Sequence, residues 1–170
     1  MKKLHLILAS LALALSTLLT PLAAQAQALT DFAENKLIDA VFRGQALGAP
    51  ATFYVALFTT ACSDSAAGTE VSGGSYARVA VTSSLANWAG TQSAGSTTAS
   101  TGTGGQTSNN AAITFPSPTA NWGTVSHFGI FDASSAGNMW VCQSLTAPKS
   151  VNSGDSAPAF NAGALTVTFQ

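Results

Sequence analysis

The sequence predicts a mainly β protein: an antiparallel β-sandwich or jelly-roll-like barrel with one N-terminal α-helix packed on it. Two observations carry this prediction. After residue 50, apolar residues recur in short runs, several with the period of two that is typical of strands. Turns rich in Gly, Pro and Ser separate these runs, and no helical patterns alternate with them, which favours antiparallel over parallel pairing.

The N-terminus has the pattern of a secretory signal peptide. Lys2 and Lys3 precede an apolar run over residues 4–19, and small residues follow at Ala24-Gln25-Ala26. An uncleaved membrane anchor is the alternative, but the run is short for a span. We therefore expect a signal peptide over 1–26, with cleavage after Ala26 or Ala28, and a single β-rich domain over 27–170. The expected location is exported: periplasmic, cell surface or extracellular, with no membrane association after cleavage.

The charge balance argues against two classes of partner. The chain has six basic and seven acidic residues, and two of the basic ones lie in the predicted signal peptide. The remaining four form no cluster that would bind nucleic acid or an anionic membrane surface. A surface rich in neutral Ser, Thr, Ala and Gly is weakly protected against self-association. Self-assembly into a homo-oligomer or filament is therefore expected.

Two cysteines, Cys62 and Cys142, remain in an exported chain. An even count in an oxidising compartment indicates a disulfide. Closing a loop of this length would stabilise the fold by roughly 4–5 kcal/mol in the chain-entropy model. Two buried free thiols are the alternative. The spacing of Cys and His does not indicate a metal site.

The segment from Leu29 to Gly44 predicts the helix. Thr30 is a suitable N-cap, and Gly44 follows the last turn. Apolar residues at helical spacing predict one buried face: Ala33, Leu37, Ile38, Val41 and Phe42. We expect this face to pack on the chain's own sheet; docking on a partner protein is the alternative.

The strand pattern begins at Thr52–Thr60, which is apolar on both faces and is therefore expected to be covered on both. In the segment 124–131, strict alternation places Val125 on the same face as Phe131. Arg78 is expected to be exposed or paired with a carboxylate. The predicted strands after Thr60 are Tyr76–Thr82, Ala112–Phe115, two strands within Asn121–Leu145, Lys149–Asn152 and Ala164–Phe169.

Residues 90–110 form a low-complexity tract of Ser, Thr, Gly, Ala, Asn and Gln. This composition buries little apolar area to offset the entropy of ordering. We interpret the tract as a surface loop. A loop this long is otherwise functional, mobile or partly stranded, and its Ser and Thr content also allows β-pairing with a neighbouring subunit.

The sequence does not contain the combination of residues that a known catalytic site requires. After processing, His127 is the only histidine, and its alternation with apolar residues indicates a hydrogen-bonded residue at the edge of the core. Four turn carboxylates are interpreted as turn caps, with a glycosidase pair as the remote alternative: Asp64, Glu70, Asp132 and Asp155. The sequence thus predicts no enzyme, no cofactor and no metal.

Aromatic residues offer one candidate binding feature. Trp88 and Trp122 are candidate surface-binding residues for a glycan, although aromatic side chains more often fill cores. This pair supports an alternative function, an exported module that binds a glycan or a host surface.

Several segments together resemble a family of small bacteriophage and prophage structural proteins, of the tail-fibre or virion-decoration kind. They include TEVSGGSYARVAV at Thr69–Val81, FPSPTANWG within Phe115–Leu145 and STGTGGQTSN at Ser100–Asn109. The resemblance covers Ala28–Gln170 and implies a compact β-rich subunit that serves in assembly or surface contact. The signal peptide and the cysteine pair differ from what the resemblance implies.

The function we expect is therefore an exported, phage-derived, non-enzymatic structural subunit for self-assembly or surface decoration. Its partners would be further copies of itself or other structural proteins, and its location would be a virion if the gene is phage-borne.

Overall fold

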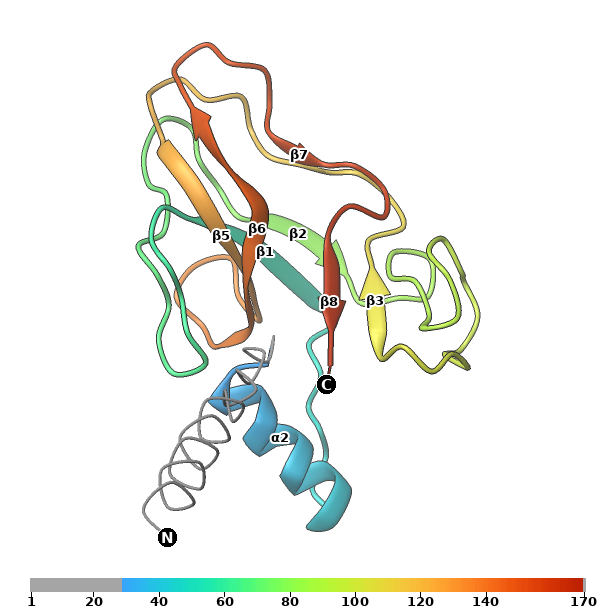
Figure 1. Ribbon diagram of the computed structural model, residues 1–170. Coiled ribbons are helices and arrows are strands. Elements are labelled where there is room, and N and C mark those ends of the chain that lie inside the picture. Colours follow the sequence, from blue (N-terminus) through green and yellow to red (C-terminus); the bar gives the residue numbers. More distant parts are fainter. Residues whose placement is uncertain (1–28, 170) are drawn as a thin grey trace, which may run out of the picture.

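The computed structural model describes residues 29–169, so the predicted signal peptide lies outside the described residues. Within 29–169, the one α-helix is too short and too polar to cross a membrane. Figure 1 shows this helix, α2 (Asp31–Phe42), at one end of a body built from strands. The strands are β1 (Thr52–Phe58), β2 (Val79–Thr82), β3 (Gln106–Ser108), β4 (Ile113–Thr114), β5 (Gly123–Phe131), β6 (Met139–Val151), β7 (Ala159–Phe160) and β8 (Thr166–Thr168).

The main sheet has four antiparallel strands in the order β2-β1-β5-β6. Two small antiparallel pairs, β3 with β8 and β4 with β7, complete the strand architecture. Side chains from both pairs enter the same core cluster as one face of the main sheet, including Ile113 of β4 and Val167 of β8. The predicted mainly β, sandwich-like fold with an N-terminal helix is confirmed.

Strand β1 is covered on both faces, as its composition predicts. Val55 and Leu57 face the larger core cluster beneath the small strand pairs. Ala56 and Phe58 face a second cluster that contains Phe131 and Cys142. Because both sets are at most 4 % exposed, β1 lies between two apolar layers.

The strict alternation predicted for 124–131 is wrong at one residue. The register of β5 against β6 is broken between Val125 and His127, where one residue of β5 stands opposite four residues of β6. An irregularity of this kind interrupts the alternation of faces along a strand. Val125 consequently packs in the larger cluster with Phe128 and Ile130, on the face opposite Phe131.

Strand lengths also differ from the prediction. The segments predicted as separate strands at 139–145 and 149–152 form the single strand β6, although Pro148 lies within it. Proline is tolerated because β6 is an edge strand of the sheet. The residues Tyr76–Arg78, predicted as strand, precede β2 instead.

The low-complexity tract is partly stranded, because β3 lies within it and pairs with β8. The remainder is ordered by polar side chains. The amide of Gln92 donates to the Thr98 hydroxyl at 2.8 Å, and the Ser96 hydroxyl accepts from the Gly90 N–H at 2.7 Å. Local hydrogen bonds of this kind substitute for the apolar burial that the composition lacks.

The packing of the helix differs most from the prediction. It begins after the Thr30 cap, but within the predicted apolar face only Ala33 is buried. Ile38, Val41 and Phe42 are 49 %, 68 % and 81 % exposed. The expectation that this face packs on the chain's own sheet is therefore wrong for the second half of α2. Figure 1 shows the reason, since the helix runs away from the strands after its first turn.

Gly129 provides a test of the packing in the second cluster, on one face of β5. A Cβ at this position would lie 2.7 Å from Cε2 of Phe58 and 3.1 Å from Cε2 of Phe131. We predict that Gly129→Ala lowers the free energy of unfolding by about 1–3 kcal/mol through overpacking. The measurement is urea denaturation. Gly104→Ala is the matched control, because its Cβ would meet no atom within 4 Å. Equal midpoints for both variants would contradict this account of the core.

Candidate assembly surface

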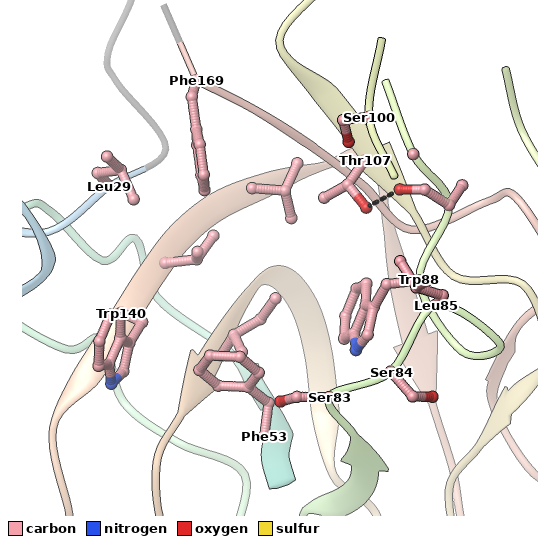
Figure 2. A pocket seen from close by; sticks show the side chains of 15 residues that line it. Leu29, Phe53, Ser83, Ser84, Leu85, Trp88, Ser100, Thr107, Trp140 and Phe169 are labelled. Atoms are coloured by element: carbon pink, nitrogen blue, oxygen red, sulfur yellow. Dashed lines mark hydrogen bonds between the residues drawn. The ribbon is translucent and has the colours of Figure 1, made fainter. Parts of the chain in front are cut away.

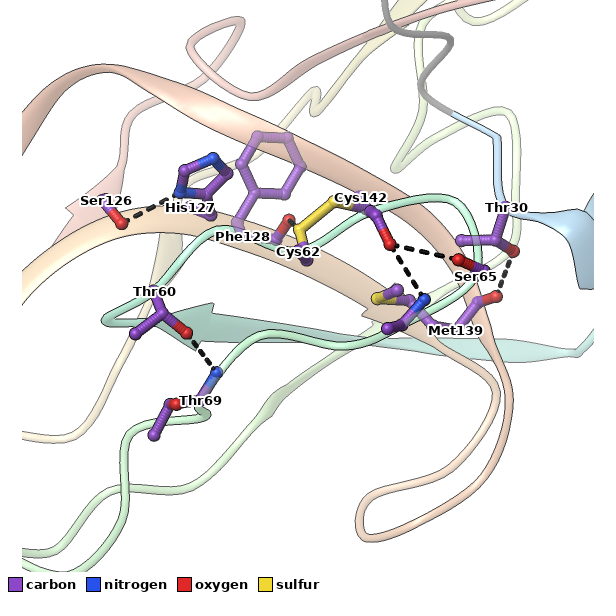
Figure 3. The surroundings of a disulfide bond; sticks show 12 residues. Thr30, Thr60, Cys62, Ser65, Thr69, Ser126, His127, Phe128, Met139 and Cys142 are labelled. Atoms are coloured by element: carbon purple, nitrogen blue, oxygen red, sulfur yellow. Dashed lines mark hydrogen bonds between the residues drawn. A yellow bond between two sulfur atoms is a disulfide. The ribbon is translucent and has the colours of Figure 1, made fainter.

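The start of α2 is fixed to β6 and to the loop after β1. The Thr30 N–H donates to the carbonyl of Trp140 at 3.1 Å, and its hydroxyl donates to the carbonyl of Met139. The N–H of Asp31 donates to the carbonyl of Asp64 at 3.0 Å. Since Thr30 is only 2 % exposed, these bonds are shielded from water. They hold the first turn of the helix rigidly on the sheet (Figure 3).

The disulfide expected from the cysteine count lies beside this anchor (Figure 3). Cys62 and Cys142 are bonded, with Cα atoms 5.9 Å apart and 80 positions between them in the sequence. The bond ties the loop after β1 to β6. Asp64 belongs to the same loop, so the disulfide also secures the carbonyl that receives the N–H of Asp31.

The other end of α2 is an apolar knob, made of Ile38, Val41 and Phe42. These residues lie three and four positions apart and therefore share one side of the helix. The neighbouring charges are already paired, since Arg43 Nη1 lies 3.0 Å from Asp39 Oδ1. Gly44, at φ +67°, ends the helix. The knob is thus rigid, apolar and exposed.

An apolar cavity of about 520 Å³ lies beside the helix start. Figure 2 shows Trp140 and Trp88 on opposite sides of it. None of the described residues that line it is charged; its larger side chains are Leu29, Phe53, Leu85, Trp88, Trp140 and Phe169. Two of its polar groups are internally bonded, because the Thr107 hydroxyl donates to Ala89 and the Ser83 hydroxyl to Pro50. The cavity therefore suits an apolar occupant.

The cavity wall carries two unpaired donors. The indole N–H groups of Trp88 and Trp140 are buried and have no hydrogen-bond partner among residues 29–169. Trp140 is fixed by edge-to-face contacts with Phe32 at 5.4 Å and Phe53 at 5.8 Å between ring centroids. Buried donors without acceptors are costly. Because both nitrogen atoms are closed to solvent, an occupant of the cavity would meet the apolar surfaces of these rings.

Away from the cavity, Arg78 pairs with a carboxylate, one of its two predicted environments. Its Nε and Nη2 donate to the two oxygens of Glu70 at 2.9 and 2.8 Å, and its side chain is 6 % exposed. Nη1 donates to the carbonyls of Ala133 and Ala136 at 2.9 and 2.8 Å. The guanidinium also lies 3.7 Å from the centroid of the Phe131 ring.

Tyr76 belongs to the same network. Its hydroxyl donates to Glu70 at 2.9 Å and accepts from the N–H of Leu57 at 2.9 Å. Burial raises the pKa of Tyr76 well above the ordinary tyrosine value; the Leu57 N–H opposes this shift and the Glu70 charge adds to it. The phenol is a structural donor, not an acid or base at neutral pH.

The two candidate surface-binding tryptophans are separated by the fold. Trp122 is 5 % exposed, donates its indole N–H to Gly74 at 3.0 Å and packs edge-on against Tyr76. It is a core residue with no ring face open to a ligand, which corrects its expected surface role. Trp88 is half-buried and lines the cavity. Residue type alone did not distinguish them.

The residues considered for chemistry form local hydrogen bonds. Nδ1 of His127 lies 2.9 Å from the Ser126 hydroxyl. Asp132 accepts from the N–H of Asn138 at 2.7 Å, and Asp155 from the N–H of Asn152 at 2.7 Å, as turn caps do. In the part of the chain that the structure describes, no group of three or more His, Cys, Asp and Glu residues could hold a metal ion.

The sequence predicted the apolar face that forms the knob, with docking on a partner protein as the alternative to packing on the chain's own sheet. The spacing of Ile38, Val41 and Phe42 does not say which surface covers them, and the cavity was not predicted. The cavity had no sequence signal, because its walls come from segments as distant as Leu29, Leu85 and Phe169.

Comparison with known proteins identifies the family of this chain. The model of the family described as Podophage GP4 fiber I protein gp80 matches residues 28–168. A search of curated proteins found no match. The predicted resemblance to phage tail-fibre structural proteins is confirmed, over nearly the whole domain.

The disulfide yields a stability prediction. Reducing it, or replacing both cysteines by alanine, should lower the free energy of unfolding by roughly 4–5 kcal/mol, since the unfolded chain regains the entropy of a large loop. Thermal unfolding with and without dithiothreitol measures this. The Cys62→Ala/Cys142→Ala variant is the control, because reductant should not change its Tm. An unchanged Tm in the reduced parent chain would contradict the prediction.

Tyr76 yields a prediction for alkaline pH. Its pKa is raised in the folded state, so its contribution to stability is complete below about pH 10 and is lost as the pH rises towards the folded pKa. Above about pH 10, the free energy of unfolding should fall more steeply in the parent than in Tyr76→Phe, by at most about 1.4 kcal/mol per pH unit. Urea titrations between pH 8 and about pH 11.5 measure the two slopes. Parallel curves would show that Tyr76 titrates alike in both states.

Proposed function

The chain belongs to the family of the podophage GP4 fiber I protein gp80, and we propose that it is an exported, phage-derived subunit that self-assembles or decorates a surface. The family match over residues 28–168 carries this proposal. A structural phage protein acts by presenting surfaces to further copies or to other structural proteins. The relevant features are therefore the surfaces that this fold leaves uncovered.

The knob of α2 supports a role in assembly. Fully burying a large apolar side chain stabilises by about 1.5–3 kcal/mol, so three exposed ones on one rigid turn favour association. The outer edge of the main sheet is a poorer candidate. The exposed half of β6 contains Pro148 and Lys149, two residues that oppose edge-to-edge pairing.

A non-enzymatic role is part of the proposal. The carboxylates of Glu70, Asp132 and Asp155 are bonded to a guanidinium or to turn amides. Groups committed in this way are poor candidates for acid–base chemistry, which needs a proton position facing substrate.

Export is supported by the N-terminal pattern of residues 1–26 and by the disulfide. Disulfides persist in oxidising compartments and are rare in the cytosol. The proposed location is the cell surface, the extracellular space or the virion.

The alternative function is an exported module that binds a glycan or host surface. Trp88 favours it, because this ring lines an open cavity on which a sugar ring could stack. Ser84 and Ser100 beside it supply hydroxyl groups.

Self-assembly predicts concentration-dependent mass. The purified protein should sediment as dimers or larger species at roughly 10–100 µM, the range expected of a modest apolar interface. Sedimentation velocity over a dilution series, with electron microscopy for filaments, measures this. Strictly monomeric behaviour would contradict assembly; if such a monomer bound a glycan array and Trp88→Ala did not, the alternative would replace it.

A further inference from the structure

We propose that the apolar knob of one copy inserts into the apolar cavity of a second copy, joining subunits head to tail. This rests on the proposed function of self-assembly and adds the two surfaces that perform it.

The two surfaces match in polarity. The knob exposes Ile38, Val41 and Phe42, and the cavity presents the rings of Phe53, Trp88 and Trp140. No described residue lining the cavity is charged, and the nearest charges on the helix, Asp39 and Arg43, neutralise each other. Two copies of an acidic protein therefore meet here without placing an unpaired charge in the interface.

The knob that enters the cavity belongs to another copy, because α2 cannot reach the cavity of its own chain. Leu29, which directly precedes Thr30, lines the cavity, and Thr30 is hydrogen-bonded to β6. From that point the 12-residue helix carries the knob about 18 Å away along a rigid axis. Figure 1 shows α2 leaving the body at this end. The knob of a neighbour meets no such constraint.

A contact between two different surfaces leaves one free knob and one free cavity on every pair. Such a heterologous contact adds further subunits, giving a ring if the rotation closes and a filament if it does not. The same two surfaces thus build an extended structure from one kind of chain.

The test uses two single variants, each damaging one surface. Phe42→Ser removes the knob, and Leu85→Lys places a charge at the cavity wall; both residues are exposed, at 81 % and 55 %, so folding should be retained. Each variant alone should need a roughly ten- to hundred-fold higher concentration to associate, the equivalent of one large buried apolar side chain. Asn35→Ser on α2 and Ala86→Lys beside Leu85 are the matched controls and should associate like the parent.

Mixing the two variants gives the decisive measurement. Phe42→Ser retains its cavity and Leu85→Lys retains its knob, so an equimolar mixture should recover one parental contact and stop at a heterodimer. Sedimentation velocity of the mixture at a concentration where each variant alone is monomeric detects this dimer. Circular dichroism checks the fold of each variant, and Val41→Ser replaces Phe42→Ser should the latter fail to fold.

The outcomes separate this inference from the function on which it rests. A monomeric parent chain would refute self-assembly itself. A parent that assembles while both variants assemble equally well would overturn the knob-and-cavity contact and leave self-assembly standing. Loss of association in Phe42→Ser but not in Leu85→Lys, or a mixture that stays monomeric, would show that the knob meets a surface other than the cavity. A Leu85→Lys effect on Tm alone would assign the cavity to a segment of the same chain.

Discussion

The partly buried ion pair between Arg78 and Glu70 is the interaction on which the arrangement of the loops depends. The guanidinium joins three segments: the loop after β1 through Glu70, the β5–β6 turn through Ala133 and Ala136, and the residues before β2. Ala136 adopts a left-handed conformation at φ 49°, which disfavours a side chain. Its carbonyl bond to Arg78 offsets that strain. Removing Glu70 would leave the buried guanidinium of Arg78 without its counterion.

The turn between β5 and β6 also helps to fix the start of α2. The turn leads directly into Met139 and Trp140, whose carbonyls accept the bonds of Thr30. The disulfide fixes the other side of the same anchor through Cys142. Polar and covalent constraints thus hold the first turn of the helix, while nothing in residues 29–169 covers Val41 and Phe42. A rigid base with an exposed apolar end is the geometry that an assembly element requires.

The sequence predicted the class of fold because strand periods and turn residues are local signals. It predicted that β1 is covered on both faces, and it placed the cap of α2 at Thr30. It failed at Val125, since the break in the pairing of β5 with β6 changes the facing there and depends on the partner strand, which is distant in the sequence. It also assigned Trp122 the same role as Trp88, because burial of an aromatic ring depends on neighbours distant in the chain.

The sequence by itself determined that this is a charge-poor, mainly β protein with an amphipathic helix and a cysteine pair, because composition and periodicity are properties of short segments. Only the tertiary structure decided where the apolar face of α2 points. The anchor at Thr30 directs that face away from the sheet, and the cavity gathers Leu29, Leu85 and Phe169 from three distant segments. Both depend on long-range contacts, and local sequence patterns do not encode long-range contacts.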